Sequence, residues 1–294
     1  MRGAEMLREG DCGAGMTGYR FDTEETDMEL SLTCVLKRKH LFVFDMDGTL
    51  YLGNSVLPGA AEFICRLRGE GRKLLFFTNN ASHDPLFYYE KLEKMGFDPQ
   101  DGEVLTSGDV TAEFLVRHRL GKSVYAVGTP ELERQLLRYG VVLREEADIV
   151  LTSFDTTLTY RKLEHACRLI RNGAEFLSTH PDLNCPTENG FIPDSGAIAA
   201  LITASTGKKP IYFGKPCRSA LEMMLELTGE KPEDAVIFGD RLYTDIALGK
   251  RNGVTAVLTL TGETSKAEAE QASPEQRPDY LVEDMSEASD ALFS

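Results

Sequence analysis

The sequence lacks the features that mark membrane-spanning and secreted proteins. No stretch approaches the roughly 20 consecutive apolar residues that a membrane-spanning helix needs. The longest apolar runs, such as residues 41–44 and 74–77, have the length of strands. The N-terminus shows no basic segment followed by an apolar one, so we expect no secretory signal. We therefore expect a cytoplasmic protein with no membrane partner.

Paired cysteines and an excess of basic residues are also missing. Six cysteines are scattered over 294 residues, with no CxxC pair and no histidine at zinc spacing. This usage indicates reduced thiols and makes a structural zinc site improbable. The chain has 32 Lys and Arg against 47 Asp and Glu, which gives a net charge of −15. Because such a surface repels phosphate backbones, we expect no nucleic-acid partner, although a local basic pocket for a small anion is compatible with it.

Apolar runs and helical patterns alternate from about residue 39 onward. The runs at residues 41–44 and 74–77 are each followed by an amphipathic helix that ends at glycine, and the rhythm returns at 211–213, 235–238 and 254–258. Continuous apolar strands that alternate with helices predict an α/β fold with a Rossmann-like, doubly wound parallel sheet covered on both faces.

The middle of the chain has an α/β rhythm of its own. We interpret residues 121–207 as a second α/β domain inserted into a core made of residues 38–120 and 208–294. Residues 1–37 show no sustained period and are expected to be a poorly ordered extension. A GxGxxG match at residues 13–18 lacks the flanking strand and helix of a dinucleotide loop. In the insert, strands are expected at 124–127, 149–151 and 175–177, and helices at 130–139, 160–172 and 197–205.

Polar residues follow four of the apolar runs of the predicted core. Because the carboxyl ends of parallel strands meet at one edge of a sheet, we expect these residues to lie together. Taken singly, all but the first of these motifs are better explained by turn, surface-loop or helix-cap chemistry, but four strand ends with complementary chemistry are hard to attribute to chance. They are Asp45 and Asp47, then Thr78 and Asn79, then Lys215, then Asp240 with Asp245.

Several carboxylates in one place repel each other unless a cation lies among them. The candidate ligands are all oxygens, which selects a hard ion, with Mg²⁺ favoured over Ca²⁺. Lys215, the Thr78 hydroxyl and the backbone N–H groups around Asp47 would hold an anion beside the metal. A phosphate bound there next to a free carboxylate invites in-line attack by that carboxylate.

The ordered segments DMDGTL at 45–50, Thr78-Asn79, Lys215-Pro216 and Gly239-Asp240 with Asp245 resemble the four motifs of the haloacid-dehalogenase-like (HAD) phosphatases. The insert, with VGTP at 127–130, STHPD at 178–182 and PDSG at 193–196, is similar to the α/β cap of their NagD-like, para-nitrophenyl-phosphatase branch. The resemblance covers about residues 40–290. His180 stands where many relatives would have Asn.

The resemblance implies a role for each residue of the core motifs. Asp45 would be the nucleophile that becomes an aspartyl phosphate, and Asp47 the general acid and then base. Thr78 and Asn79 would bind the phosphoryl oxygens, which Lys215 would neutralise. The metal site for Mg²⁺ would comprise Asp45, the backbone carbonyl of Asp47 and Asp240, with Asp245 orienting bound water or the neighbouring loop.

The resemblance also implies an activity and a class of partner. We expect a Mg²⁺-dependent phosphatase acting on a small phosphorylated metabolite, such as a sugar phosphate, a nucleoside monophosphate, phosphoglycolate or pyridoxal phosphate. In the cap, Asp182, Asn184 and Cys185 either read the substrate or form a polar turn. A homodimer through the cap is a further expectation. Two alternatives stay open: a phosphotransferase that uses a second metabolite, and a catalytically silent ligand-binding protein on the same fold.

Overall fold

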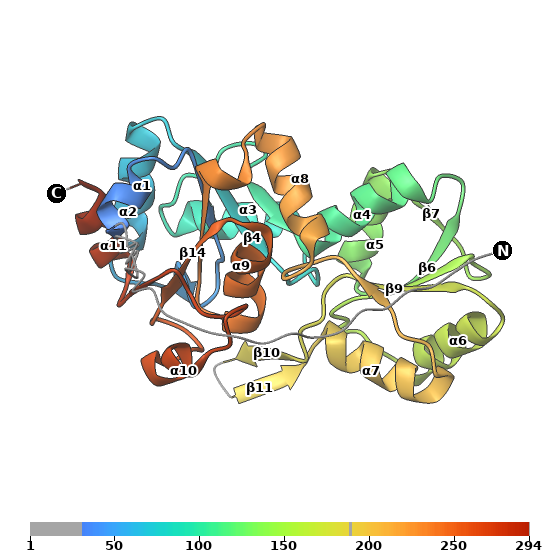
Figure 1. The fold of residues 1–294 in the computed structure, drawn as a ribbon. Helices are drawn as coiled ribbons and strands as arrows, with labels where there is room; N and C mark the ends of the chain where they lie inside the picture. The colour runs from blue at the N-terminus through green and yellow to red at the C-terminus, as the bar shows by residue number, and fades with distance from the viewer. Residues whose placement is uncertain (1–30, 188–189, 294) are drawn as a thin grey trace, which may run out of the picture. The chain divides into compact units, whose positions relative to one another are not determined.

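Two parallel sheets form the framework of the computed structural model, which describes residues 31–187 and 190–293 (Figure 1). Helices lie on both faces of the first sheet, so the predicted α/β class with a doubly wound parallel core is confirmed. Most of the predicted N-terminal extension, including the GxGxxG match at 13–18, lies outside the described residues.

The first sheet has six strands, and every neighbouring pair in it is parallel. Its central strands are almost entirely buried, because helices cover both faces and leave no side for polar residues. From one edge to the other, the order is β15 (Tyr280–Val282), β14 (Thr255–Thr259), β13 (Ala235–Gly239), β1 (Leu41–Phe44), β4 (Lys73–Thr78) and β5 (Val104–Thr106).

Successive side chains of β1 point to opposite faces of this sheet, as the pleat of a strand requires. Phe42 and Phe44 point to one face, where each meets the ring of Phe63 edge-on. Leu41 and Val43 belong to the apolar cluster of the other face. The first face is covered by α1 (Leu32–Leu36), α2 (Ala60–Gly69), α3 (Pro85–Lys94) and α11 (Met285–Phe293), and the second by α4 (Ser107–His118), α8 (Arg218–Thr228) and α9 (Ala247–Asn252).

Helix α1 lies in the segment that the sequence predicted to be poorly ordered. Leu36 is fully buried in the same apolar cluster as α11. Ser31 caps the helix by accepting the Cys34 N–H at 3.4 Å. The structure therefore differs from the expectation for residues 31–37, since a single buried leucine and a cap anchor a helix too short to show a period.

The second sheet has five strands, again all parallel. Its edge strand β12 (Ile211–Tyr212) corrects the prediction that residues 211–213 form a core strand, because β12 pairs with β9 of the second sheet. The remaining strands are β9 (Glu175–Ser178), β8 (Ile149–Thr152), β6 (Ser123–Val127) and β7 (Val142–Leu143), and the helices of this region are α5 (Pro130–Arg138), α6 (Tyr160–Arg171) and α7 (Ser195–Thr206).

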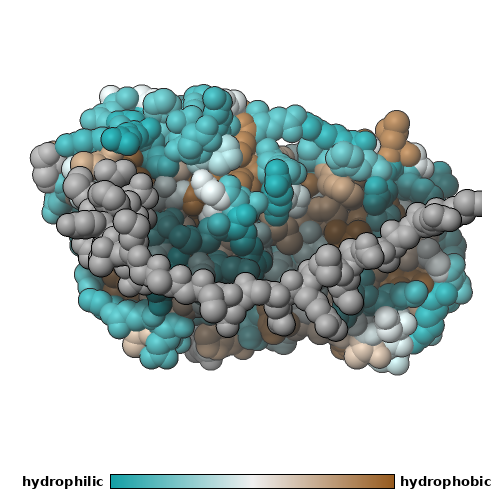
Figure 2. All heavy atoms as spheres, in the orientation of Figure 1, coloured by the Kyte–Doolittle hydropathy of each residue, from teal (hydrophilic) through white to brown (hydrophobic). Residues whose placement is uncertain are grey.

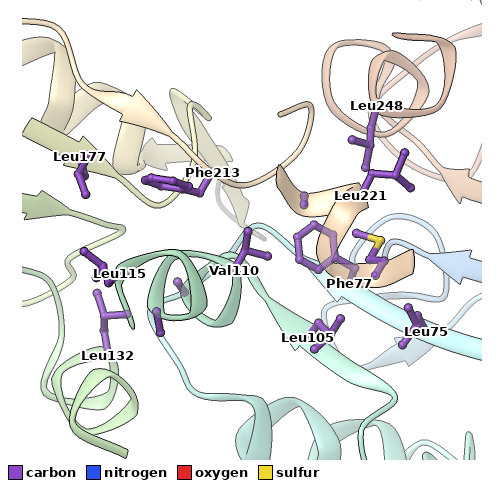
Figure 3. Close-up of a cluster of buried hydrophobic side chains, with 14 of the residues drawn as sticks. Leu75, Phe77, Leu105, Val110, Leu115, Leu132, Leu177, Phe213, Leu221 and Leu248 are labelled. Carbon is purple, nitrogen blue, oxygen red and sulfur yellow. The ribbon is translucent and has the colours of Figure 1, made fainter. Parts of the chain in front are cut away.

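One apolar cluster runs from the first sheet to the second (Figure 3). Leu75 of β4 lies toward one end, and Leu177 of β9, Leu132 of α5 and Leu115 of α4 lie at the other, with Phe77 and Val110 between them. The described residues accordingly form one compact unit. The predicted domain boundaries, at residues 120/121 and 207/208, stay a prediction.

Two hairpins and short helices complete the described residues. The first hairpin directly follows the DMDGTL segment, and the second leads into α7. Within residues 31–187 and 190–293 no helix combines the length and apolar character needed to cross a membrane, and hydrophilic residues cover most of the face shown in Figure 2. These elements are the pairs β2 (Tyr51–Leu52) with β3 (Ser55–Val56) and β10 (Asn184–Thr187) with β11 (Gly190–Pro193), the 3₁₀-helix Pro232–Asp234, the π-helix Leu242–Ile246 and α10 (Lys266–Gln271).

Candidate active site

Three carboxylates converge at the carboxyl edge of the first sheet. Asp45 follows β1 and Asp240 follows β13, and these strands are neighbours. Asp245 lies in the π-helix that begins just after Asp240. One oxygen from each of the three carboxylates lies within 4.8 Å of the other two. The sequence predicted this convergence from the positions of these residues after apolar runs, and the structure brings the three residues together.

Two glycines make room for the Asp240 side chain. A Cβ atom at Gly48 would lie 2.6 Å from Asp240 Oδ2, and one at Gly262 would lie 2.0 Å from the same oxygen. Gly48 also has a φ of +87°, which side chains rarely adopt. The glycine after Asp47 is therefore required both by its backbone conformation and by the carboxylate packed against it.

Lys215 supplies the positive charge of this cluster. Its ammonium lies 2.5 Å from Asp45 Oδ1 and 2.6 Å from Asp245 Oδ1, and it donates to the Phe77 carbonyl at 3.1 Å. Burial acts to lower the pKa of Lys215, but the carboxylates of Asp245 and Asp45 outweigh it and raise the pKa. Because β12 belongs to the second sheet, three strand ends of the first sheet and one of the second build the site.

The acidic cluster carries more negative than positive charge, and burial raises the pKa of two of its carboxyl groups. Burial raises the pKa of Asp45 to about 6, although Lys215 acts in the opposite direction. It raises the pKa of Asp240 to about 8, and the neighbouring charge of Asp45 adds to this effect. Asp240 Oδ1 is buried and has no hydrogen-bond partner among the described residues. An unpartnered carboxylate oxygen beside two further carboxylates fits a hard divalent cation.

Asp47 and Thr78 line the space in front of this cluster. Burial raises the pKa of Asp47, against the effect of the positive charges of Lys91 and Arg241. The Thr78 hydroxyl oxygen accepts the Asn80 N–H at 3.1 Å, which leaves the hydroxyl proton to donate into the cavity. The structure thus places both residues where the sequence predicted them.

The side chain of Asn79 is occupied by protein contacts. Its amide nitrogen donates to both oxygens of Asp182 at 3.2 Å and to the Lys215 carbonyl at 2.9 Å. Its amide oxygen accepts the Lys215 N–H at 2.8 Å. Asn79 therefore fixes the loop that carries Lys215 and joins it to Asp182, and its amide has no donor left for a phosphoryl oxygen. The predicted hydrogen bond from Asn79 to a phosphoryl oxygen stays a prediction, and in this conformation the side-chain amide is not available to make it.

The three substrate-reading candidates of the insert have different environments. Asp182 is buried and lies 3.5 Å from a guanidinium nitrogen of Arg241, in addition to its hydrogen bonds with Asn79. Cys185 is half-buried and lines the cavity. Asn184 is exposed and does not line it. The structure thus places Asp182 and Cys185 at the site and leaves Asn184 outside it.

His180 does not line the cavity but is hydrogen-bonded to Asp194, which does. Its Nε2 atom lies 2.8 Å from Asp194 Oδ1, and its Nδ1 atom lies 2.9 Å from Thr179 Oγ1. Burial acts to lower the pKa of His180, but the charge of Asp194 outweighs it and raises the pKa. Asp194 also caps α7 by accepting the Ser195 N–H at 2.5 Å. His180 therefore orients Asp194 at the cavity wall.

Asp45, Asp47 and Lys215 line a cavity of about 210 Å³. Sequence reasoning missed two cations of its wall, Lys91 and Arg241, and the ring of Tyr51. Arg241 directly follows Asp240, so its position next to a predicted ligand was an available signal. Lys91 is one of two lysines on α3 and carried no such signal, because packing decides which face of a helix points toward a site.

Comparison with known proteins agrees with this geometry. Residues 42–142 match the sequence model of the haloacid dehalogenase-like hydrolases, and residues 212–288 match a second model of HAD-like hydrolases. The acid sugar phosphatase of Staphylococcus saprophyticus is 36% identical to the chain over 254 residues, which cover 86% of the chain and 97% of that protein.

Solved structures of similar proteins share the fold over most of the chain. The 4-nitrophenylphosphatase of Thermotoga maritima superposes with a TM-score of 0.84 at 43% identity, over 87% of this chain and 98% of that one. The p-nitrophenyl phosphatase of Archaeoglobus fulgidus gives a TM-score of 0.81 at 27% identity, over 86% and 99% of the two chains. A structure described as a NagD protein gives 0.80 at 41% identity, over 86% and 98%. The chain therefore belongs to the NagD-like branch of the haloacid dehalogenase-like hydrolases and is a phosphomonoester hydrolase.

Proposed function

We propose that the protein is a Mg²⁺-dependent phosphatase that hydrolyses small phosphomonoesters through an aspartyl phosphate on Asp45. The observation that carries this proposal is the convergence of Asp45, Asp240 and Asp245 around Lys215, with one buried oxygen of Asp240 lacking any partner among the described residues. Such an arrangement is costly to a protein unless a cation and an anion complete it.

The residues that would hold Mg²⁺ are Asp45, Asp240 and the backbone carbonyl of Asp47, with Asp245 beside them. All are oxygen donors, as this ion prefers. When bound, the ion would compensate charge on the transferring phosphoryl oxygens. Lys215 supplies the same compensation from the protein, because its ammonium already lies 2.5 Å from the attacking carboxylate.

In the first half of the reaction, a carboxylate oxygen of Asp45 attacks phosphorus in line with the ester oxygen. The bond from phosphorus to the ester oxygen breaks, and the leaving alkoxide takes a proton from Asp47. The raised pKa of Asp47 suits this role, because burial favours the protonated form of the carboxyl group. The Thr78 hydroxyl donates to a phosphoryl oxygen.

In the second half, Asp47 is a carboxylate and accepts a proton from water. That water attacks phosphorus, the bond to Asp45 breaks, and phosphate leaves with both carboxyl groups restored. Asp182 joins the insert to the core through Asn79 and Arg241, so the insert covers the reacting atoms. Such a cover excludes bulk water from the cavity except for the water that Asp47 activates.

The size of the cavity and the names of the relatives support a small substrate. About 210 Å³ suits a phosphoryl group with a short leaving group. The Staphylococcus relative is named for sugar phosphates and the Thermotoga relative for 4-nitrophenyl phosphate. We therefore propose phosphorylated metabolites of the size of a small sugar phosphate.

Replacing Asp45 tests the nucleophile. We expect Asp45→Asn to lower kcat with 4-nitrophenyl phosphate by more than about 10³-fold, because loss of a covalent nucleophile leaves only binding and electrostatic effects. The matched control is Asp101→Asn, which replaces an exposed aspartate and should retain full activity. In Asp47→Asn, mass spectrometry should find a phosphoryl group on the peptide that contains Asp45.

Two outcomes would overturn parts of this proposal. Undiminished turnover by Asp45→Asn would remove the nucleophile. Transfer of the phosphoryl group to an added alcohol in preference to water would replace hydrolysis with the phosphotransferase alternative. Product analysis with and without the alcohol distinguishes these cases.

A further inference from the structure

Lys91 is the one cation of the cavity wall that has no carboxylate at ion-pair distance in the described parts of the chain. The wall contains three Lys and Arg side chains. Lys215 lies between Asp45 and Asp245, and Arg241 lies between Asp182 and Glu263. The ammonium of Lys91 instead lies 3.8 Å from the centre of the Tyr51 ring.

The Tyr51 ring restricts the position of the Lys91 ammonium. Lys91 is half-buried on α3, and the Tyr51 ring below it is almost fully buried, with 2% of its surface exposed. An ammonium over an aromatic face is attracted by the ring and loses part of its rotational freedom. Binding an anion through this group therefore costs less ordering than it would for a free surface lysine.

The position of Asp47 decides which part of a substrate Lys91 meets. Under the function proposed above, Asp47 protonates the leaving oxygen, so the leaving group lies on its side of the phosphorus. Asp47 and Lys91 line the same cavity, and the charge of Asp47 acts to raise the pKa of Lys91, against the lowering effect of burial. Lys91 is therefore a neighbour of the leaving group, whereas Lys215 is the neighbour of the nucleophile.

We propose that Lys91 is a specificity-determining residue that binds a second anionic group, a carboxylate or a phosphate, on the leaving group of the substrate. This inference rests on the proposed phosphatase function and narrows its substrate class to doubly anionic small metabolites. An unpaired, preoriented ammonium in a wall whose other cations are already paired is complementary to one further negative charge.

A different role for Lys91 is compensation of the charge that Asp47 acquires in the reaction. That role would act on every substrate alike, because the leaving oxygen of every ester takes its proton from Asp47. Recognition of a second anion acts only on substrates that carry one. The ratio of kcat/KM between matched substrates separates the two roles.

The experiment measures kcat and KM for two matched pairs of substrates, with Mg²⁺ present. Phosphoglycolate and 2-hydroxyethyl phosphate differ in a carboxylate, and fructose 1,6-bisphosphate and fructose 6-phosphate differ in a second phosphate. The pair that shows the larger preference in the unmodified protein identifies the anion. The variants are Lys91→Met, Lys91→Arg and, as the matched control on the same helix, Lys94→Met. Lys94 is exposed and its ion-pair partner is Glu90.

For the preferred pair, we expect Lys91→Met to lower the ratio of kcat/KM, anionic over neutral, by about 10–100-fold, the usual effect of losing a hydrogen bond to a charged group. The change should appear mainly as a raised KM of the anionic substrate. Lys91→Arg should restore most of the ratio, and Lys94→Met should leave it unchanged.

An unchanged ratio in Lys91→Met, with both substrates slowed alike, would overturn this inference and leave the phosphatase proposal intact. So would the absence of a preference for either anionic substrate in the unmodified protein. Failure of the unmodified protein to hydrolyse 4-nitrophenyl phosphate or any of the four esters would instead overturn the proposed function, and this inference with it.

Discussion

The carboxyl edges of the two parallel sheets make an informative comparison, because they share an architecture and differ in chemistry. At the first edge, β1 and β13 end in Asp45 and Asp240. At the second edge, β8 and β9 end in hydroxyl groups, and Thr179 Oγ1 donates to Ser153 Oγ at 3.1 Å and lies 2.9 Å from His180 Nδ1.

The two edges differ in whether their buried polar groups find hydrogen-bond partners within the protein. The polar groups at the second edge are buried and bonded to each other, as buried polar groups usually are. The first edge leaves a buried carboxylate oxygen of Asp240 without a partner among the described residues. A buried carboxylate oxygen without a partner destabilises the fold, and such sites are typically completed by a ligand from outside the chain. The unpartnered carboxylate therefore distinguishes the reactive edge from the structural one.

Nearly isosteric substitutions at the two edges should have opposite effects on stability and very different effects on activity. We expect Asp240→Asn to lower kcat/KM by more than about 100-fold, since even residues behind a metal ligand are worth 10–100-fold. The same change should raise the melting temperature of the metal-free protein, because it removes a buried charge. Thr179→Val should lower the melting temperature, because it leaves Ser153 and His180 with fewer partners.

Calorimetry in the presence of a chelator measures both shifts. We expect Thr179→Val to lower the free energy of unfolding by about 1–3 kcal/mol. In a protein of this size, about 1 kcal/mol corresponds to a change of roughly 2–4 °C in the melting temperature. A fall in melting temperature for Asp240→Asn in metal-free buffer would break the comparison, since it would show that the carboxylate is already compensated within the protein.

The stabilisation by Mg²⁺ should depend on pH with a definite sign. Burial raises the pKa of Asp45 to about 6 and that of Asp240 to about 8, from a usual value near 4. An acid whose pKa is raised by folding binds more protons in the folded state, so the metal-free protein loses stability as pH rises from about 4 to 8. Mg²⁺ competes with these protons and therefore binds more tightly as pH rises.

Melting curves with and without Mg²⁺ at pH 5.5 and pH 8 measure this effect. We expect the rise in melting temperature caused by Mg²⁺ to be a few degrees larger at pH 8, as a tenfold gain in affinity is worth about 1.4 kcal/mol of stability. An equal or larger rise at pH 5.5 would show that neither carboxylate loses a proton when the ion binds.

The reactive edge was predictable from the sequence because its signals are local. Asp45 and Asp240 each follow a buried apolar run, and the carboxyl ends of parallel strands share one edge whatever the order of the strands. The placement of β12 was not predictable in this way. Its two residues carry no pattern, and its pairing with β9 is decided by packing between segments distant in the sequence.

The partners of individual side chains were also beyond local signals. The sequence predicts that Thr78 and Asn79 both bind phosphate, but the side-chain amide of Asn79 is hydrogen-bonded to Asp182 and to the Lys215 carbonyl. Nothing near Asn79 in the sequence indicates this, because Asp182 lies about a hundred residues further along the chain. The role of Lys91 likewise depends on which face of α3 packs beside Tyr51.

Anomalous scattering from a crystal grown with Mn²⁺ in place of Mg²⁺ tests the central claim most directly. The account predicts one strong peak between Asp45 and Asp240, because these carboxylates share the ion beside the attacking oxygen. A peak among His180, Asp182 and Asp194, whose ligand atoms also lie within 4.8 Å of one another, with none at Asp45 and Asp240, would contradict it.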